Sequence, residues 1–296
     1  QTRYLYVQPK NKIDVLFLGS SHVHCNVNTQ LLWDEYGMAA YLMTGAEQPL
    51  WNSYYNLKEA LKNQKPKLVV LDMFCPSRFY DDFQPGWADE NLDGMRISLN
   101  KLEAVYTSVQ EEQSHFFLGF TEYHSRYDQL TTEDFQNFVW NRKTQERWKG
   151  YTPLNRHAEL TEPDMSHVTT SQEMTEKSKE YFEKVVELTK KEGITLALIS
   201  GPYLLEERDQ EVYNFIGQLA EKDGLLFWNT NTPAHYREMG LDFSTDYADH
   251  AHLNEAGGAK YTAYLGKWLS QNYSFPDRRG QKGYESWENQ LMKSGE

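Results

Sequence analysis

Short runs of apolar residues alternate along the chain with longer stretches in which apolar residues recur every three or four positions. The nearly uninterrupted runs predict five buried strands, over residues 13–18, 39–43, 67–73, 194–200 and 225–228. Helical periodicity predicts helices over residues 51–63, 172–192, 207–222 and 255–271. Strands that alternate with helices in this way favour an α/β protein with a parallel sheet.

The order of these elements predicts a flavodoxin-like, doubly wound sheet of five parallel strands, because the strands alternate with helical crossovers. The third and fourth strands are separated by residues 76–171, which this basic fold does not need. Helical periodicity recurs there near 97–112 and 131–148, and a polar loop follows around 152–170. We expect residues 76–171 to form an insertion over the carboxyl edge of the sheet, either as a lid or as a substrate platform.

The length of 296 residues allows a sizeable core without disulfide bonds. Residues 1–272 are expected to form one domain that contains the insertion, and the polar, glycine-containing residues 273–296 a peripheral C-terminal tail. No stretch approaches the ~18 consecutive apolar residues of a membrane-spanning helix. The only cysteines, Cys25 and Cys75, follow strands expected to be neighbours. They could form a disulfide in an oxidising compartment or remain two buried thiols.

Charge and aromatic content narrow the classes of ligand. The formal net charge of −13 argues against a general nucleic-acid binder, because affinity for phosphates depends on clustered lysine and arginine. Phenylalanine, tryptophan and tyrosine make up 14% of the residues, and their flat rings can stack on sugars or pack in a core. Trp87, Trp140 and Trp148, all in the insertion, are candidate glycan platforms, although packing is the more ordinary use of such side chains.

One stretch departs from the generic pattern, because the first strand ends in GSSH at residues 19–22. Gly19 permits a turn that a side chain would crowd. Ser21 follows at the start of the next helix, where free backbone N–H groups favour developing negative charge. Ligands of open α/β sheets bind beyond the carboxyl ends of the strands. Ser21 is therefore a candidate nucleophile, although a serine at this position is also an ordinary helix cap.

A second stretch, DYADHAHLNEAGG at residues 246–258, precedes the last predicted helix. Asp249 and His252 are three residues apart, so one tight turn can bring the carboxylate and the imidazole to the same side. A serine hydroxyl becomes a useful nucleophile when an imidazole takes its proton and a carboxylate fixes the tautomer of that imidazole. Ser21, His252 and Asp249 supply these three roles, and His250 is expected to be a solvent-facing or supporting neighbour.

Together, these two stretches resemble the SGNH (GDSL-like) hydrolase and acyltransferase superfamily. The family carries its serine in a Gly-x-Ser turn after the first strand, which GSS at residues 19–21 matches. It carries Asp-x-x-His before its last helix, which DHAH at residues 249–252 matches, and LNEAG at residues 253–257 looks like its usual continuation. The resemblance covers residues 13–73 and 194–270 and leaves out the insertion.

The resemblance implies an acyl-serine intermediate on Ser21, with neither a metal nor another cofactor. It implies an oxyanion hole made by the N–H of Ser21, the N–H of Gly45 after the second strand, and an asparagine after the third strand. The chain departs from the family at the third donor, because LDMFCPSRF at residues 71–79 has no such asparagine. Either another group supplies that donor or the hole has two. Four further residues are expected to contact the substrate: His22, Gln48, Arg78 and Asn254.

The layout of GSSH, PKLVVLD and HLNEAGGAKYTAYL looks closest to bacterial cell-surface proteins that acylate polysaccharides. Examples are the D-alanyl-transfer protein of the teichoic-acid pathway and the alginate-type O-acetyltransferases. This resemblance implies a glycan or acyl-ester substrate and a membrane-bound O-acyltransferase as partner. It also implies an extracellular or cell-surface location, with anchoring through a segment that would precede residue 1.

Other interpretations stay open on the residues alone. His22 and His24 form a His-x-His pair that, with the DHAH motif, could ligate a metal ion in an amidohydrolase-like enzyme. The five predicted strands are fewer than the eight of such a barrel, and Ser21 would then have no role. A third interpretation is an SGNH-like scaffold that binds a glycan or a partner without catalysis. Arg78 could pair with an anionic substrate group or form a surface salt bridge.

Overall fold

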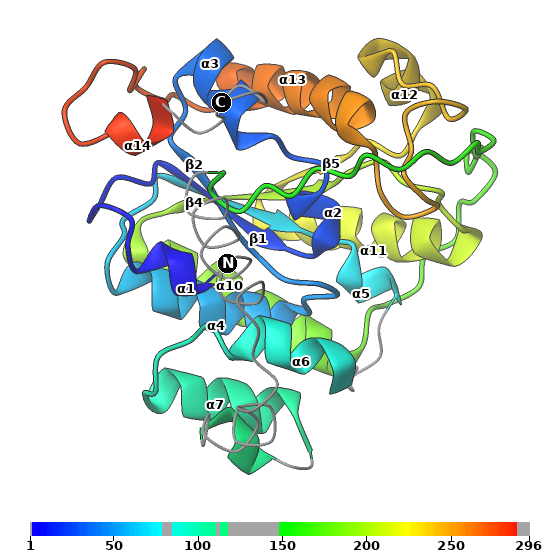
Figure 1. The fold of residues 1–296 in the computed structure, drawn as a ribbon. Helices are drawn as coiled ribbons and strands as arrows, with labels where there is room; N and C mark the ends of the chain where they lie inside the picture. Colours follow the sequence, from blue (N-terminus) through cyan, green and yellow to red (C-terminus); the bar gives the residue numbers. More distant parts are fainter. Residues whose placement is uncertain (1, 79–84, 111–112, 118–147, 289–296) are drawn as a thin grey trace, which may run out of the picture.

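The computed structural model of the chain describes residues 2–78, 85–110, 113–117 and 148–288. Its centre is a parallel sheet with the strand order β2-β1-β3-β4-β5 (Figure 1). The strands are β1 (Val15–Gly19), β2 (Ala40–Thr44), β3 (Leu68–Asp72), β4 (Thr195–Ser200) and β5 (Leu226–Asn229). This is the strand order of flavodoxin-like sheets, so the predicted fold class is confirmed. Each strand lies within two residues of its predicted position.

The strand order reverses between β1 and β3, because the chain first crosses from β1 to β2 and then returns to the other side of β1. In the register, Leu18 of β1 faces Leu71 of β3, while Gly19 faces Thr44 of β2. Ligands of open α/β sheets bind at such a switch point, beyond the carboxyl ends of the two strands. The end of β1 is therefore the topological place for a site.

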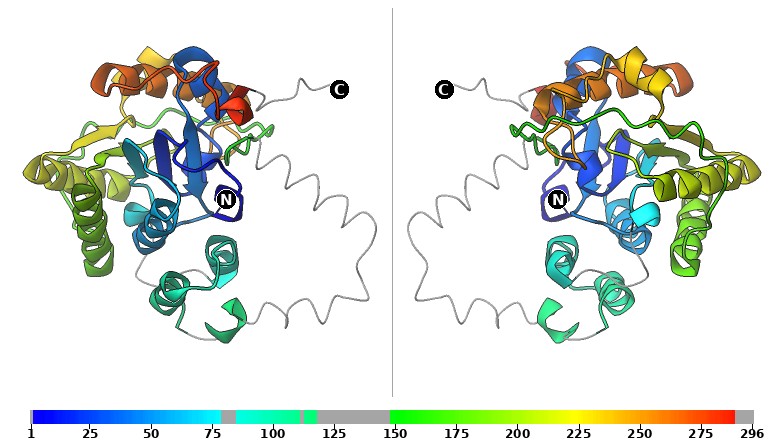
Figure 2. Two further views of the ribbon diagram at one scale, coloured as in Figure 1. Left: turned by 90° about the vertical axis from the view of Figure 1, so that its left-hand side faces the viewer. Right: turned by 90° about the vertical axis from the view of Figure 1, so that its right-hand side faces the viewer.

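Helices cover both faces of the sheet (Figures 1 and 2). One face packs against α4 (Leu50–Leu61), α10 (Glu176–Glu192) and α11 (Glu207–Asp223), and the other against α3 (Thr29–Tyr36), α12 (Pro233–Met239) and α13 (Glu255–Asn272). Adjacent strand residues point to opposite cores, so Leu16 belongs to the first core and Phe17 to the second. This two-sided burial explains why the strands read as uninterrupted apolar runs. Among the described residues, no helix combines the length and the apolar character needed to cross a membrane.

The first part of the insertion contains α5 (Cys75–Arg78), α6 (Pro85–Leu92), α7 (Leu99–Ser108) and a 3-10 helix, η1 (Gln113–Phe116). The helix predicted near 97–112 corresponds to α7, and the one predicted near 131–148 lies outside the described residues except for its last position. Helix α6 reaches the carboxyl edge of the sheet, where Asn91 Nδ2 donates to the carbonyl of Ala46 at 2.8 Å. By contrast, α7 packs on α4, with Asn100 Nδ2 donating to the carbonyl of Tyr55 at 3.0 Å.

The last part of the insertion includes an extended segment, residues 152–160, which we call the strap. Its backbone is hydrogen-bonded at one end to α2 (Ser21–His24), through the Thr152 amide and the His24 carbonyl at 2.7 Å. At its other end, Ala158 forms an antiparallel bridge with Tyr247. The polar loop expected here therefore lies along the segment that carries the DHAH motif.

The C-terminal segment is not peripheral, which corrects the expectation for residues 273–296 over the part that is described. Arg278 donates from two nitrogens to Asp14, at 2.7 and 2.9 Å. Trp287, in α14 (Glu285–Glu288), is fully buried, and its indole N–H donates to the carbonyl of Ala40 at 3.1 Å. At the other end of the chain, α1 (Thr2–Leu5) adds the buried side chain of Leu5 to the same core.

The two cysteines are buried free thiols, so the disulfide alternative is excluded in this structure. Burial raises the pKa of Cys25 to about 12 and raises that of Cys75 well above the ordinary thiol value. Because the thiolate is the reactive form of cysteine, these side chains are inert packing groups.

Trp287→Ala should destabilise the protein by about 3–5 kcal/mol, because it removes a fully buried aromatic side chain and one buried hydrogen bond. Urea unfolding measures the effect. The matched control is Tyr106→Ala on α7, where the ring is 62% exposed and the change should stay within about 0.5 kcal/mol. Equal, small effects of both changes would show that the C-terminal segment is peripheral after all.

Candidate active site

Ser21 lies where the sequence pattern placed it, at the first position of α2 directly beyond β1. Gly19 has φ of +149°, a conformation that residues with a side chain rarely adopt. A Cβ at this position would also lie 2.4 Å from the Cβ of Asp72. Ser20 caps α2 by accepting a hydrogen bond from the His22 amide. The glycine therefore permits the sharp turn that exposes Ser21 at the edge of the sheet.

The turn is held from below by Asp72, the last residue of β3. Its Oδ2 accepts hydrogen bonds from Ser20 Oγ at 2.9 Å and from the Ser20 amide at 3.3 Å. Its Oδ1 accepts from the amide of Phe74 at 3.3 Å. Burial outweighs these hydrogen bonds and raises the pKa of Asp72 to about 6. The sequence reasoning missed this residue, although a carboxylate at the end of a buried strand was a visible signal.

The motif before α13 brings its carboxylate and imidazole to Ser21. His252 Nδ1 lies 2.9 Å from Asp249 Oδ1, and His252 Nε2 lies 2.8 Å from Ser21 Oγ. With its Nδ1 proton donated to the carboxylate, the imidazole has a lone pair on Nε2 that accepts the serine proton. The structure thus joins the three predicted residues in one hydrogen-bonded chain, across a separation of 231 residues.

Asp249 is kept in its ionised form by its local backbone. Burial alone would raise the pKa of Asp249, but the amides of Ala251 and His252 donate to Oδ1 at 2.9 and 3.0 Å. These bonds and the neighbouring imidazole hold the pKa of Asp249 below its usual range. The Asp-x-x-His spacing therefore makes the turn that fixes the carboxylate as well as the contact between the two side chains.

His22 and His24 do not converge on one point. The His22 ring is buried, stacks on Phe74 with centroids 3.5 Å apart, and lies 5.4 Å from the ring of His252. His24 Nδ1 lies 3.2 Å from Thr44 Oγ1, and burial lowers the pKa of His24 to about 3. Within the part of the chain that the structure describes, no group of three or more His, Cys, Asp or Glu side chains could hold a metal ion. The geometry thus gives no support to a metal centre built on His22 and His24.

The side chains of Gln48 and Asn254 are engaged within the protein, so the prediction that they contact the substrate is corrected. Gln48 is 2% exposed, and its amide is bonded to Ser53 at 3.0 Å and Asn56 at 2.8 Å. Asn254 caps α13, with its Oδ1 accepting from the amide of Gly257. His22 is also buried, and its ring packs beside that of His252. It therefore supports the site from inside the protein and does not present its ring to solvent.

The predicted oxyanion donors are only partly in place. The Ser21 amide belongs to the first residue of α2, where no carbonyl of the same helix is available to it. The Gly45 amide donates to the carbonyl of Gly19 at 3.3 Å, which continues the ladder between β1 and β2. Gly45 can act as a donor only if that bond is given up, so its role stays a prediction.

The predicted substrate platforms have different environments. Trp87, on α6, is 40% exposed, whereas Trp148 is partly buried and packs against the second core. Trp140 and the side chain of Arg78, the last residue of α5, lie outside the described parts of the structure. Trp87 is therefore the one platform among these that the structure leaves accessible. His250, within the DHAH motif, is exposed as expected.

Arg156 was not anticipated, because nothing in its local sequence distinguishes it from other charged surface residues. It lies on the strap, and its Nη2 donates to Asp249 Oδ2 at 2.9 Å. The structure thus brings a cation to the outer oxygen of the carboxylate whose inner oxygen holds His252.

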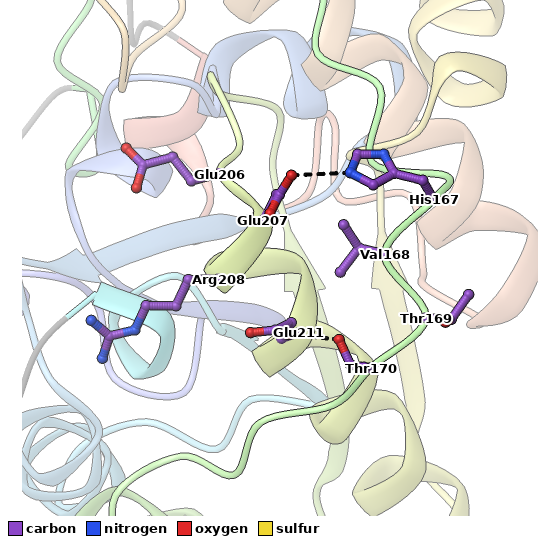
Figure 3. Close-up of a pocket in the computed structure, with 8 residues that line it drawn as sticks. All are labelled: His167, Val168, Thr169, Thr170, Glu206, Glu207, Arg208 and Glu211. Carbon is purple, nitrogen blue, oxygen red and sulfur yellow. Dashed lines mark hydrogen bonds and ion pairs between the residues drawn. The ribbon is translucent and has the colours of Figure 1, made fainter.

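A cavity of about 530 Å³ lies beside the start of α11, between that helix and the insertion (Figure 3). Several lining side chains bond one another, His167 with Glu207 at 3.1 Å and Thr170 with Glu211 at 2.6 Å. The lining is formed by His167, Val168, Thr169, Thr170, Glu206, Glu207, Arg208 and Glu211, and includes neither Ser21 nor His252.

Asp72 should make the free energy of unfolding depend on pH, and this contribution should be absent from the Asp72→Asn variant. The folded protein keeps the Asp72 proton up to pH about 6, whereas an unfolded aspartate loses it near pH ~3.9. Stability is therefore lost as the pH rises through this window. As the pH rises from about 4 to about 7, the free energy of unfolding of the wild type should fall by up to about 3 kcal/mol relative to that of Asp72→Asn. Urea unfolding at a series of pH values measures this difference, and parallel curves for the two proteins would contradict the assignment.

Comparisons with known proteins add a likeness in structure. No family model matches the chain, and no curated protein matches its sequence. One similar solved structure is that of a candidate acylhydrolase from Bacteroides fragilis, with 13% sequence identity and a TM-score of 0.45. The likeness covers 91% of this chain and 94% of that chain.

Proposed function

We propose that this protein is a serine-dependent acyl-ester hydrolase or O-acyltransferase of the SGNH type that works through an acyl-serine intermediate. The observation that carries the proposal is the hydrogen-bonded chain from Ser21 through His252 to Asp249, with distances of 2.8 and 2.9 Å. A nucleophile, a base and a carboxylate in this order are the parts that acyl transfer requires. They lie at the switch point of the sheet, where such folds bind ligands.

The first half of the reaction forms the acyl-serine. Ser21 Oγ attacks the ester carbonyl while its proton passes to His252 Nε2, and the carbonyl oxygen becomes an oxyanion. Asp249 stabilises the imidazolium that results. The amide of Ser21, and that of Gly45 if it is released from Gly19, would donate to the oxyanion. When the tetrahedral intermediate collapses, the ester C–O bond breaks and the leaving alkoxide takes the proton from His252.

The second half returns the enzyme to its starting state. A hydroxyl group, from water or from a sugar, attacks the acyl carbonyl and gives its proton to His252 Nε2. Ser21 Oγ then leaves as the new acid or ester forms, and recovers the proton from His252. Because both acceptors use the same base, the chemistry of the triad is compatible with hydrolysis and with transfer.

We further propose a cell-surface glycan as the acceptor and a membrane-bound O-acyltransferase as the partner that supplies the acyl group. The resemblance of GSSH, PKLVVLD and HLNEAGGAKYTAYL to polysaccharide-acylating proteins of the bacterial surface supports this assignment. Trp87 adds a physical argument, because an exposed indole face suits stacking on a sugar ring. It lies on α6, whose next turn contacts the loop after β2 through Glu90 and Asn91.

Ser21→Ala and His252→Ala should each abolish turnover of p-nitrophenyl acetate, and Asp249→Asn should lower kcat by about 10²–10⁴-fold. The serine variant lacks the nucleophile, and the other two lose the base or its orientation. Turnover is followed by absorbance of the released nitrophenolate. His250→Ala, at an exposed neighbouring position, is the matched control and should retain the wild-type rate. Wild-type rates in all three variants would contradict the assignment of Ser21, His252 and Asp249 as the catalytic groups.

Incubation with an activated acyl donor should add one acyl group to the peptide that contains Ser21, as detected by mass spectrometry. A glycan acceptor that is a true substrate should then remove the label faster than water does and carry the acyl group itself. The Ser21→Ala variant is the control for labelling elsewhere. Loss of the label at the same rate with and without every acceptor tested would favour a hydrolase over a transferase.

A further inference from the structure

We infer that Arg156 is a positioning residue for the proposed catalytic triad, and that the strap delivers it to Asp249. The inference rests on the proposed function, because it assigns a role in that same site. Arg156 Nη2 lies 2.9 Å from Asp249 Oδ2, the oxygen that His252 does not use.

The two oxygens of Asp249 have different tasks. Oδ1 accepts the three bonds that come from its own turn, from His252 Nδ1 and from the amides of Ala251 and His252. Oδ2 accepts from Arg156. A carboxylate bonded on one oxygen alone can still tilt about that contact, whereas bonds to both oxygens fix its plane. The plane of Asp249 in turn sets the direction of the His252 ring toward Ser21.

The backbone on both sides of Arg156 is tied to the segment that carries the triad. The Leu154 carbonyl accepts from the amide of Glu255, the first residue of α13, at 3.0 Å. Ala158 donates its amide to the carbonyl of Tyr247 at 2.8 Å, within an antiparallel bridge. These bonds lie two residues before and two residues after Arg156. They therefore fix the backbone of Arg156 relative to Asp249.

The ion pair between Arg156 and Asp249 is better explained as a means of orienting the Asp249 carboxylate than as a means of stabilising the fold. The Arg156 side chain is 67% exposed and that of Asp249 26% exposed, and an ion pair so open to water adds little to the free energy of folding. Removal of Arg156 should therefore leave the fold intact. The effect should appear in the reaction, where a small misplacement of a catalytic group has a large cost.

The test compares Arg156→Gln with Glu159→Gln, a matched change at another exposed position of the strap. With p-nitrophenyl acetate, Arg156→Gln should lower kcat by about 10- to 100-fold with KM nearly unchanged, and Glu159→Gln should retain wild-type values. Arg156→Lys, which keeps one charged donor, should recover part of kcat. Because the site is exposed, guanidinium ion at non-denaturing concentrations should also restore activity to Arg156→Gln, which a purely structural role would not permit.

Three outcomes would overturn the inference: an unchanged kcat in Arg156→Gln, a raised KM with unchanged kcat, or a loss that neither lysine nor guanidinium ion reverses. The second would make Arg156 a substrate contact, and the third a packing residue. Failure of the proposed function is recognised separately, because wild-type turnover would then not depend on Ser21. Urea unfolding of Arg156→Gln checks that the variant is folded in every case.

Discussion

The site depends on one buried carboxylate beneath the end of β1. Asp72 at the end of β3 accepts two hydrogen bonds from Ser20, and it lies so close to Gly19 that no side chain fits between them. These contacts exist because the strand order places β3 directly beside β1. Burial raises the pKa of Asp72 to about 6, so its ionised form is held at the expense of folding stability near neutral pH. The hydrogen bonds that Asp72 accepts from Ser20 hold the turn that carries Ser21.

The other two residues of the site, Asp249 and His252, come from a segment far from Ser21 in the sequence. Every strand of a parallel sheet ends at the same edge, so the segment before α13 arrives where β1 ends. It is then secured from two sides. The Oδ1 of Asn26, just beyond α2, accepts a hydrogen bond from the amide of Leu253 at 3.1 Å. Before the motif, Ala158 of the strap forms an antiparallel bridge with Tyr247. The 2.8 Å contact between His252 and Ser21 is therefore the result of backbone bonds on both sides of the motif.

The sequence predicted those features for which one physical requirement determines both the local residue pattern and the local structure. The strands β1, β2 and β3 are buried on both faces and are therefore nearly continuous apolar runs, which made them recognisable. Likewise, the three-residue spacing of Asp249 and His252 specifies their turn. Gln48 and Asn254 were misread because a polar residue type does not show whether its partners are solvent or protein. Trp287 was missed because one aromatic in a polar segment has no periodicity. Arg156 contacts a residue 93 positions away, which no local pattern records.

In the proposed reaction, water and a sugar hydroxyl would both give their proton to His252. Discrimination must come from how the acceptor is held. Water is present at high concentration, so a transferase needs a binding surface that raises the effective concentration of the sugar hydroxyl beside the acyl-serine. Among the described residues, α6 is suited to this role. It combines the exposed Trp87 with two hydrogen bonds to Ala46, next to Gly45, because the Ala46 amide donates to Glu90 and Asn91 donates to the Ala46 carbonyl. The helix thus connects a stacking surface to the proposed oxyanion hole. Selectivity for transfer would then reside in the insertion, while the proposed reactive groups lie on α2 and in the loop before α13.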